Sequence, residues 1–390
     1  MRQFMKILVP FAMLLTLTGL YSFAGSKQTN PSITPTTNPP SPDLTGGYTT
    51  QQITTSDMYN KLPRINNSGS LVWQAKVDGH FQIFYKPFSE ETPVQVTNDA
   101  FDNTDPRIND QEQIVWMGGD KVHSEIYLYS KGEVTQITAT TLSNRHPKLN
   151  NIGEVVWIAG TADADGKVDN YETFHYADGV VTQVTDNNQF NVQVRINDAG
   201  TMMWRGKGTT DFDIFTRSAG VTTQITADGT LDVNPQISPN GNMVWERNDG
   251  ADDEIVLMLD QASGPVQITN NSANDCEPQV NDNGVVVWQG FDGTHWQIYM
   301  YADGETTQLT EGMTDNTEPR LNAAGDIAWM VHDTEGIGIA VYQAATKTIS
   351  KISGTYTGHY TQMVDLNDQG QVVWAGSSGS NFEVVLATPQ

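Results

Sequence analysis

Short apolar runs that end in tryptophan recur along the whole chain. The first run, at residues 71–73, follows the segment Pro-Arg-Ile-Asn at 63–66 and a turn that contains glycine. Close versions return at spacings of 41 to 47 residues, and their tryptophans are Trp116, Trp157, Trp204, Trp245, Trp288, Trp329 and Trp374. Self-similarity at this period is typical of repeat folds. Because each tryptophan ends an apolar run, we interpret all eight, including Trp73, as core residues.

Each repeat predicts four short β-strands. In the unit that ends at residue 310, we expect strands over 279–281, 285–288, 296–301 and 306–310. Asp-Asn-Gly and Asp-Gly sequences separate these runs, and such residues accept the backbone conformations that tight hairpin turns need. No apolar period of 3.6 residues continues over three helical turns, so the pattern excludes a helical repeat.

The repeats predict an all-β, eight-bladed β-propeller with four-stranded antiparallel blades. Radial stacking buries both faces of such units, and a closed ring leaves few exposed strand edges. Seven complete units extend from residue 63 to 353, whereas the eighth, at 364–388, has only its first three strands. The missing fourth strand, elsewhere Thr-Gln-Ile-Thr, is matched by Thr-Gln-Gln-Ile-Thr at 50–54. We therefore expect the N-terminal strand to complete the last blade and close the ring. Seven blades with a hairpin appendage is the alternative.

The N-terminal region predicts export. Residues 1–24 combine a basic start, an apolar stretch and Ser-Phe-Ala, which is the pattern of a cleaved signal peptide. An uncleaved anchor is the alternative, and no later stretch could span a membrane. Residues 25–47 are rich in Pro, Thr and Ser and predict a disordered linker, while 48–390 form the propeller domain. We expect an extracellular or periplasmic bacterial protein without membrane insertion after cleavage.

The charge and the cysteine content limit which binding partners and which stabilising bonds are expected. The net charge of −25 disfavours binding to nucleic acid and to anionic membrane surfaces. It also fits simple solubility or the binding of divalent cations. Cys276 is the only cysteine, so no intramolecular disulfide holds the fold. We expect a monomer whose partner is a glycan or a protein.

One repeat resembles a known family closely enough to name it. The segment 232–241, Asp-x-x-Pro-x-Ile-Ser-Pro-Asn-Gly, is followed by Met-Val-Trp, Glu-Ile-Val at 254–256 and Val-Gln-Ile-Thr at 266–269. This order resembles the TolB-type, WD-like β-propeller repeat, and the resemblance covers nearly all of 48–390. It implies the blade but not the function, because such blades occur in periplasmic binding proteins, lyases and peptidase gating domains. The α/β domain of TolB and the Gly-x-Ser-x-Gly motif of propeller peptidases are not recognised in these 390 residues.

A ring of basic residues is the first candidate site. The position after the repeat's proline is occupied in turn by Arg64, Arg107, Lys148, Arg195, Gln236, Gln279, Arg320 and Asp365. Brought round one axis on the innermost strands, five cations could bind a carboxylate or sulfate through charge-assisted hydrogen bonds. The alternative is that each cation pairs with a nearby acid and holds adjacent blades together. Asn or Asp three residues before the proline is expected to cap the turn that leads into the strand.

Aromatic residues at the start of the third strand form a second candidate site. They are Phe81, Tyr171, Phe212, Trp296 and Phe382, and aromatic rings can stack on sugars. Trp296, Phe81 and Phe212 are therefore taken as candidate ligand-binding residues, with Trp296 favoured because Asp292 and His295 surround it. Packing between neighbouring blades is the alternative.

The long loop of the third repeat is a candidate metal site. Asp163, Asp165 and Asp169 alternate with other residues around a glycine, as in loops that bind hard cations. The loop lacks the full EF-hand pattern, so an ordinary acidic hairpin is the alternative. A weaker acidic cluster lies at 249–254. Apart from this calcium candidate, no cofactor is expected.

Three classes of function remain open at this stage. We favour an exported, non-enzymatic binding propeller that presents loop-face sites to a glycan or protein, because the repeats show no concentrated acid–base set and no catalytic residue can be assigned. A polysaccharide-active enzyme resembling uronate lyases is the alternative. It would use the channel face, with His146, His295 or Tyr171 in proton transfer. A structural cell-surface protein is the third possibility.

Overall fold

All regular elements in the described part of the protein are β-strands. The computed structural model describes residues 47–55, 58–187, 189–259, 264–334, 336–353, 362–377 and 381–390. The predicted signal peptide and nearly all of the predicted linker lie outside these residues. None of the described residues forms a helix of the length and hydropathy that a membrane span requires.

The strands follow one another in groups of four. The first strand, β1 (Tyr48–Gln52), precedes these groups. The next strands are β2 (Asn60–Ile65), β3 (Leu71–Val77), β4 (His80–Lys86) and β5 (Val94–Gln95); β6 (Asp102–Ile108), β7 (Ile114–Gly119), β8 (Ser124–Ser130) and β9 (Glu133–Gln136); β10 (Ser143–Leu149), β11 (Val155–Gly160), β12 (Glu172–Ala177) and β13 (Val180–Gln183); β14 (Asn191–Ile196), β15 (Met202–Lys207), β16 (Phe212–Ser218) and β17 (Val221–Gln224).

The second half of the chain continues the same order. Its strands are β18 (Leu231–Ile237), β19 (Met243–Asn248), β20 (Asp253–Met258) and β21 (Val266–Gln267); β22 (Asp275–Val280), β23 (Val286–Phe291), β24 (Trp296–Ala302) and β25 (Glu305–Gln308); β26 (Asp315–Leu321), β27 (Ile327–Asp333), β28 (Gly336–Gln343) and β29 (Thr348–Lys351); and β30 (Gln362–Leu366), β31 (Val372–Ser377) and β32 (Phe382–Pro389).

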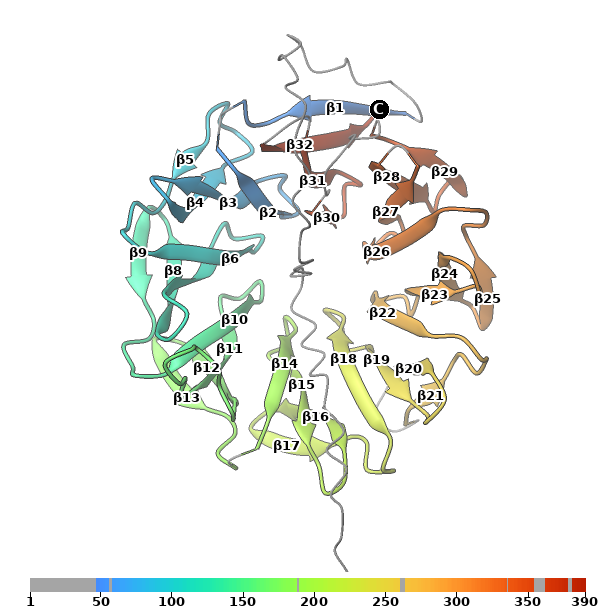
Figure 1. Ribbon diagram of the computed structural model, residues 1–390, viewed down its shortest axis with the longest axis horizontal. Helices are drawn as coiled ribbons and strands as arrows, with labels where there is room; N and C mark the ends of the chain where they lie inside the picture. Colours follow the sequence, from blue (N-terminus) through green and yellow to red (C-terminus); the bar gives the residue numbers. More distant parts are fainter. Residues whose placement is uncertain are drawn as a thin grey trace, which may run out of the picture. The chain divides into compact units, whose positions relative to one another are not determined.

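Consecutive strands within each group pair in antiparallel fashion. They form six four-stranded sheets and one eight-stranded sheet, in which the groups β6–β9 and β10–β13 are joined only by a parallel pairing of Ser124 with Ser143. The first strands, from β2 and β6 round to β30, lie nearest a common axis (Figure 1). This all-β arrangement is that of a β-propeller, as the repeats predict.

The N-terminal strand joins the last sheet. β1 pairs with β32 from Tyr48–Pro389 to Gln52–Val385, which gives the sheet order β1-β32-β31-β30. The Thr54 hydroxyl accepts a hydrogen bond from the Val384 amide at 2.9 Å and donates to the Glu383 carboxylate. Thr97 makes the same two kinds of bond in the first sheet, to the Ile83 amide and the Gln82 side chain. Strand β1 thus does what the fourth strand does elsewhere.

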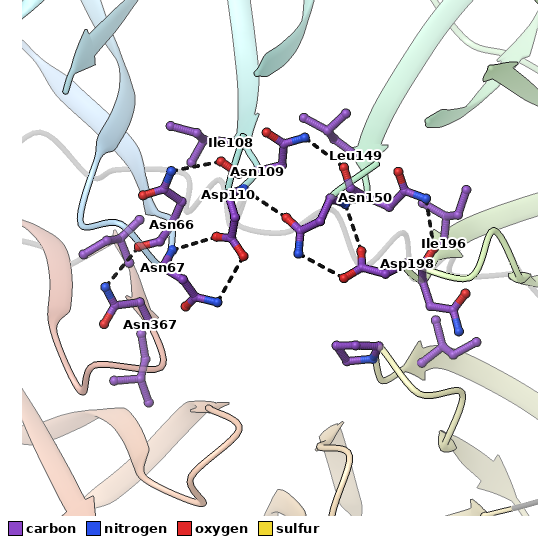
Figure 2. A pocket seen from close by; sticks show the side chains of 16 residues that line it. Asn66, Asn67, Ile108, Asn109, Asp110, Leu149, Asn150, Ile196, Asp198 and Asn367 are labelled. Atoms are coloured by element: carbon purple, nitrogen blue, oxygen red, sulfur yellow. Dashed lines mark hydrogen bonds between the residues drawn. The ribbon is translucent and has the colours of Figure 1, made fainter. Parts of the chain in front are cut away.

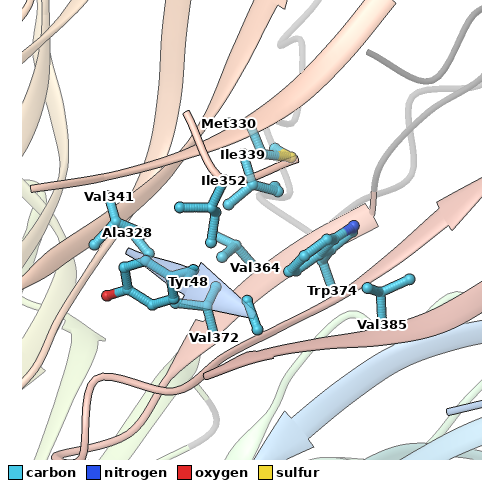
Figure 3. Close-up of a cluster of buried hydrophobic side chains, with 11 residues drawn as sticks. Tyr48, Ala328, Met330, Ile339, Val341, Ile352, Val364, Val372, Trp374 and Val385 are labelled. Carbon is cyan, nitrogen blue, oxygen red and sulfur yellow. The ribbon is translucent and has the colours of Figure 1, made fainter. Parts of the chain in front are cut away.

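The hydrophobic core is divided among the spaces between neighbouring sheets. Figure 3 shows one such cluster, in which Tyr48 of β1 and Trp374 of β31 pack with residues of β27 and β28. All eight repeat tryptophans are at most 1% exposed, which confirms their interpretation as core residues. Burying side chains of this size contributes several kcal/mol per sheet, roughly 25 cal/mol for each Å² of apolar surface.

In the repeats, the constant spacing between the Asn or Asp of the first strand and the tryptophan of the second strand has a direct structural reason. The indole N–H of each repeat tryptophan except Trp374 donates a hydrogen bond to the Asn or Asp of the first strand in its group, as from Trp73 to Asn60 at 3.0 Å. The Asn60 amide also donates to the backbone oxygens of Met58 and Phe382. The residue therefore does more than cap a turn, because it also satisfies the buried polar atom of the tryptophan.

Candidate functional site in the propeller axis

A β-bulge interrupts every first strand at the same place. The pairing register of β2 shifts between Lys61 and Arg64, and the other first strands shift at equivalent positions. The bulge residues all have φ between 50° and 57°, and they are Leu62, Asp105, His146, Gln193, Asn234, Glu277, Glu318 and Met363. Left-handed backbone is costly for non-glycine residues, and bulges of this kind redirect side chains. The bulge residue and the residue two positions later consequently become neighbours at the axis.

Four cations from consecutive sheets gather at one side of the axis, and we call them the cationic arc. They are the predicted residues Arg64, Arg107, Lys148 and Arg195, and Arg107 acts electrostatically on each of the other three. Burial, followed by the charge of Arg107, lowers the pKa of Arg64 to about 9 and that of Arg195 to about 10. The same two causes hold the pKa of Lys148 well below its ordinary value.

Asp105 and His146 complete the cationic arc. A carboxylate oxygen of Asp105 lies 2.8 Å from the Arg107 guanidinium, and the other lies 3.5 Å from His146 Nδ1. Burial alone would raise the pKa of Asp105, but Arg107, Lys148 and His146 together hold it well below its ordinary value. Asp105 is the carboxylate in short contact with these cations, and Asp365 and Glu277 also act on Arg64 and Arg195. Four cations thus outnumber three carboxylates in a partly dehydrated site. His146 was predicted on its own, whereas the sequence reasoning missed Asp105.

The remaining part of the axis has a different character. Arg320, the fifth predicted cation, pairs with the Glu318 carboxylate at 3.3 Å. Arg195 Nε donates to Gln236, and Asp365 accepts from the Ile65 amide. Glu277 carries a pKa raised by burial, followed by the charge of Glu318. The ring is therefore bipolar rather than uniformly basic, because the bulge position supplies acids to the later sheets.

A belt of asparagines lies at the turns between first and second strands. The Asn66 amide donates to the Asn109 backbone oxygen at 2.9 Å, Asn109 to Asn150, and Asn150 to Asn197. Asn367 donates in the same way to Asn66 at 3.0 Å, which links the last sheet to the first. Figure 2 shows part of this belt, and its residues line a cavity of about 250 Å³. The belt residues are used by the fold, whereas the four cations of the cationic arc outnumber the three carboxylates that act on them.

The predicted aromatic residues are not brought together with the cationic arc. Phe212 packs under the Arg205 guanidinium at 4.0 Å and against Phe190, and Trp296 packs against Phe291. Phe81 lies 6.0 Å from the Lys61 ammonium. The residues in these contacts belong to the same group of four strands as the aromatic residue itself, so the contacts decide neither for sugar stacking nor for packing between neighbouring blades.

Two of the predicted proton-transfer residues also lie elsewhere. Tyr171 is 6% exposed in a hydrophobic cluster, and burial raises its pKa. His295 lies 3.2 Å from the Asp315 carboxylate, in the turn before β24. Of the three predicted proton-transfer residues, His146 is the one that joins the cationic arc.

The predicted metal loop has internal partners. The Asp163 carboxylate accepts from the backbone amides of Asp165 and Lys167, and Asp169 forms an ion pair with Lys167 at 2.9 Å. The group of three acidic, histidine or cysteine ligands that meets within 4.8 Å in the described chain is a different one: Asp249, Asp252 and Glu254.

The comparisons with known proteins identify the fold class. No protein-family model and no curated protein matches the sequence. Among solved structures, puromycin hydrolase matches with a TM-score of 0.58 and 11% identity, over 83% of this chain and 59% of that one. The β-propeller domain of the Trilobed protease from Pyrococcus furiosus matches with a TM-score of 0.54 and 10% identity, over 77% and 99% of the two chains.

An oligogalacturonate lyase from Vibrio parahaemolyticus is similar over most of both chains. The match covers 87% of this chain and 93% of the lyase, with a TM-score of 0.57 and 10% identity. By contrast, this chain spans less than two thirds of the puromycin hydrolase chain. The likeness establishes a β-propeller. Because these neighbours are peptidases, a hydrolase and a lyase, they contradict the expectation of a non-enzymatic binding propeller and favour its enzymatic alternative.

Proposed function

We propose that this chain is an exported, eight-bladed propeller of the TolB-like type that cleaves uronate-containing oligosaccharides in its axis. The observation that carries the proposal is the cationic arc, whose four cations outnumber the carboxylates that act on them, Asp105, Asp365 and Glu277. Desolvated cations in excess favour an anionic ligand, and guanidinium groups bind carboxylates through paired hydrogen bonds. The nearly full-length likeness to an oligogalacturonate lyase supports a uronate as that anion.

The eight-blade count rests on the regular groups of four strands and on β1. Each of the first strands occupies one position round the axis, and β1 supplies the fourth strand of the group that ends the chain. The pairing of Ser124 with Ser143, which merges two groups into one sheet, is a single bridge between adjacent blades. The asparagine belt adds a link between the last blade and the first.

The site contains the groups that a β-elimination needs. Arg107 and Arg64 would bind the uronate carboxylate and so make the neighbouring C5–H more acidic. Lys148, whose pKa is held well below its ordinary value, would be present in part as the neutral amine that removes this proton. The C5–H electron pair then forms the C4=C5 double bond as the C4–O bond breaks. The leaving glycosidic oxygen takes a proton from water or from His146, whose Nδ1 lies 3.5 Å from Asp105.

The test uses oligogalacturonates, alginate oligomers and glucuronans as probes. We expect one of them to yield an unsaturated uronate, detected by its ultraviolet absorbance and by mass spectrometry. Lys148→Met should lower kcat on the order of 10²–10⁴-fold, as loss of a general base does. Lys131→Met, at an exposed turn, is the matched control and should retain activity. Absence of cleavage in every uronate, or saturated hydrolysis products, would overturn the proposed reaction.

Peptide binding in the same axis is a second candidate. The observation that favours it is the bipolar charge, with the cationic arc on some sheets and Glu277 and Glu318 on others. A short peptide carries both an amino and a carboxyl terminus, so it matches both signs. Competition between dipeptides and oligogalacturonate for the protein would show whether the two ligands share the axis, and binding of peptides alone would favour this candidate.

A further inference from the structure

Three carboxylates meet at the turn between β19 and β20. Asp249 and Asp252 lie in the turn, and Glu254 is the second residue of β20. Each offers a carboxylate oxygen, and these oxygens all lie within 4.8 Å of one another. The turn is held by a backbone hydrogen bond from Asp249 to Asp252, while Asp249 also accepts from the Ala251 amide. The backbone thus holds the turn and the Asp249 carboxylate.

Two of these carboxylates are buried without partners for their oxygens. Asp252 is 6% exposed, and neither of its carboxylate oxygens has a hydrogen-bond partner among the described residues. Glu254 is 0% exposed, and its Oε2 likewise has none there. No ion pair in the described part of the chain involves any of the three acids. Burying unpaired carboxylates is expensive unless a cation or a proton compensates them.

The next sheet shows how the same turn is built without this charge. Asp292 occupies the place of Asp249, and its backbone amide makes the equivalent bond to His295. Gln297 occupies the place of Glu254, and its amide nitrogen donates to Asp292 at 3.2 Å. An N–H group therefore bridges the two side chains in that sheet. In the turn between β19 and β20 the glutamine is replaced by glutamate and the histidine by aspartate, so the bridging donor is lost and two negative charges are added.

We infer that Asp249, Asp252 and Glu254 form a calcium-binding site. Calcium takes six to eight oxygen ligands at about 2.3–2.6 Å, and carboxylates can bind it through one or both oxygens. The three oxygens without partners supply the buried side of such a site, and the exposed Asp249 leaves the other side open for water. Burial, followed by the charges of Asp275 and Asp252, raises the pKa of Glu254, as is expected before a cation neutralises the group.

The experiment measures calcium binding directly. The full chain is treated with a chelator, dialysed and titrated with Ca²⁺ by calorimetry, and its unfolding temperature is followed at the same Ca²⁺ concentrations. We expect one tightly bound ion per chain and a rise in unfolding temperature, since a ligand that binds only the folded state stabilises it. Asp252→Asn and Glu254→Gln should each weaken binding at least tenfold.

Two controls separate loss of the site from loss of the fold. Glu254→Gln copies the bridged arrangement of Asp292 and Gln297, so it should unfold at the same or a higher temperature than the unsubstituted protein in the absence of calcium. Asp165→Asn alters the other acidic loop and should leave calcium binding unchanged. The inference is overturned if the unsubstituted protein binds no calcium, or if Asp165→Asn abolishes binding while Glu254→Gln does not.

Discussion

At the scale of single residues, the position after three of the repeat tryptophans shows how one acceptor supports a bulge. Gln74 accepts a hydrogen bond from the backbone amide of Asp105 at 2.9 Å, and Gln289 accepts from that of Glu318 at 2.8 Å. Glu246 does the same for Glu277 at 2.6 Å. An amide or a carboxyl group can fill this position because either provides the acceptor oxygen. The carboxyl group differs in that it also titrates.

Glu246→Gln should remove a destabilisation of the folded protein that grows as the pH rises. Burial, followed by the charge of Glu277, raises the pKa of Glu246 from 4.5 to about 8. The unfolded chain loses this proton at lower pH than the folded chain, so the free energy of unfolding falls as the pH rises from the unfolded-state pKa to the folded-state pKa. The variant should match the unsubstituted protein near pH 4 and exceed it above pH 8, on the order of 1–3 kcal/mol. Urea unfolding at both pH values checks this. Gln289→Glu is the reverse control and should acquire the pH dependence.

Asp105→Asn should destabilise the protein most at neutral pH. The folded-state pKa of Asp105 lies well below its ordinary value of 3.8. Its contribution to stability is therefore complete above that ordinary value and is lost as the pH falls through the folded-state pKa. We expect the free energy of unfolding to fall by about 1–3 kcal/mol near pH 7 and by less near pH 3, as measured by denaturant unfolding. Glu318 is the matched bulge residue, and its side chain is 36% exposed. Glu318→Gln, the control, should therefore lower the free energy of unfolding by less. Equal losses for the two variants at neutral pH would contradict this account.

At the scale of strands and sheets, the hydrophobic pattern predicts elements better than sites. Apolar runs ending in tryptophan locate the second strands, because burial at that position is the same in every repeat. The bulges are not visible in this pattern, because a single extra residue changes the direction of side chains without changing the apolar period. The sequence reasoning therefore found Arg107 and Lys148 from their repeat position. It missed the contact of Arg107 with Asp105, which depends on left-handed backbone at one residue.

Thr54→Ala tests whether β1 acts as a fourth strand of the last group. Thr54 and Thr97 make equivalent bonds, each accepting from a backbone amide of the third strand and donating to the side chain before it. Both threonines are 7% exposed, so each alanine variant leaves a buried amide without its acceptor. We expect losses of about 1–3 kcal/mol that agree with each other in chemical unfolding. A negligible loss for Thr54→Ala beside a clear loss for Thr97→Ala would show that β1 is not firmly held.

At the scale of the whole molecule, the residues that repeat round the axis and those that depart from the repeat have different roles. The tryptophans and the asparagine belt repeat round the axis, and they stabilise each sheet against the next. The charged positions repeat only in part, since one group of sheets supplies the cationic arc while others supply acids. The turn between β19 and β20 departs from its neighbours as well. The proposed uronate and calcium sites both lie where the repeat is broken, which is where a ligand could distinguish one blade from another.

The asparagine belt allows a test of ring closure. Asn367 and Asn109 are both 3% exposed, and each donates to the backbone oxygen of the next belt residue, at 3.0 and 2.9 Å. Each also accepts from two backbone amides of its own turn. In a closed ring, Asn367→Ala and Asn109→Ala should cost the same, about 1–3 kcal/mol, because each leaves equivalent buried groups unpaired. Thermal unfolding should remain a single transition in both variants. If the ring is open between the last sheet and the first, Asn367→Ala will lower the unfolding temperature far less than Asn109→Ala.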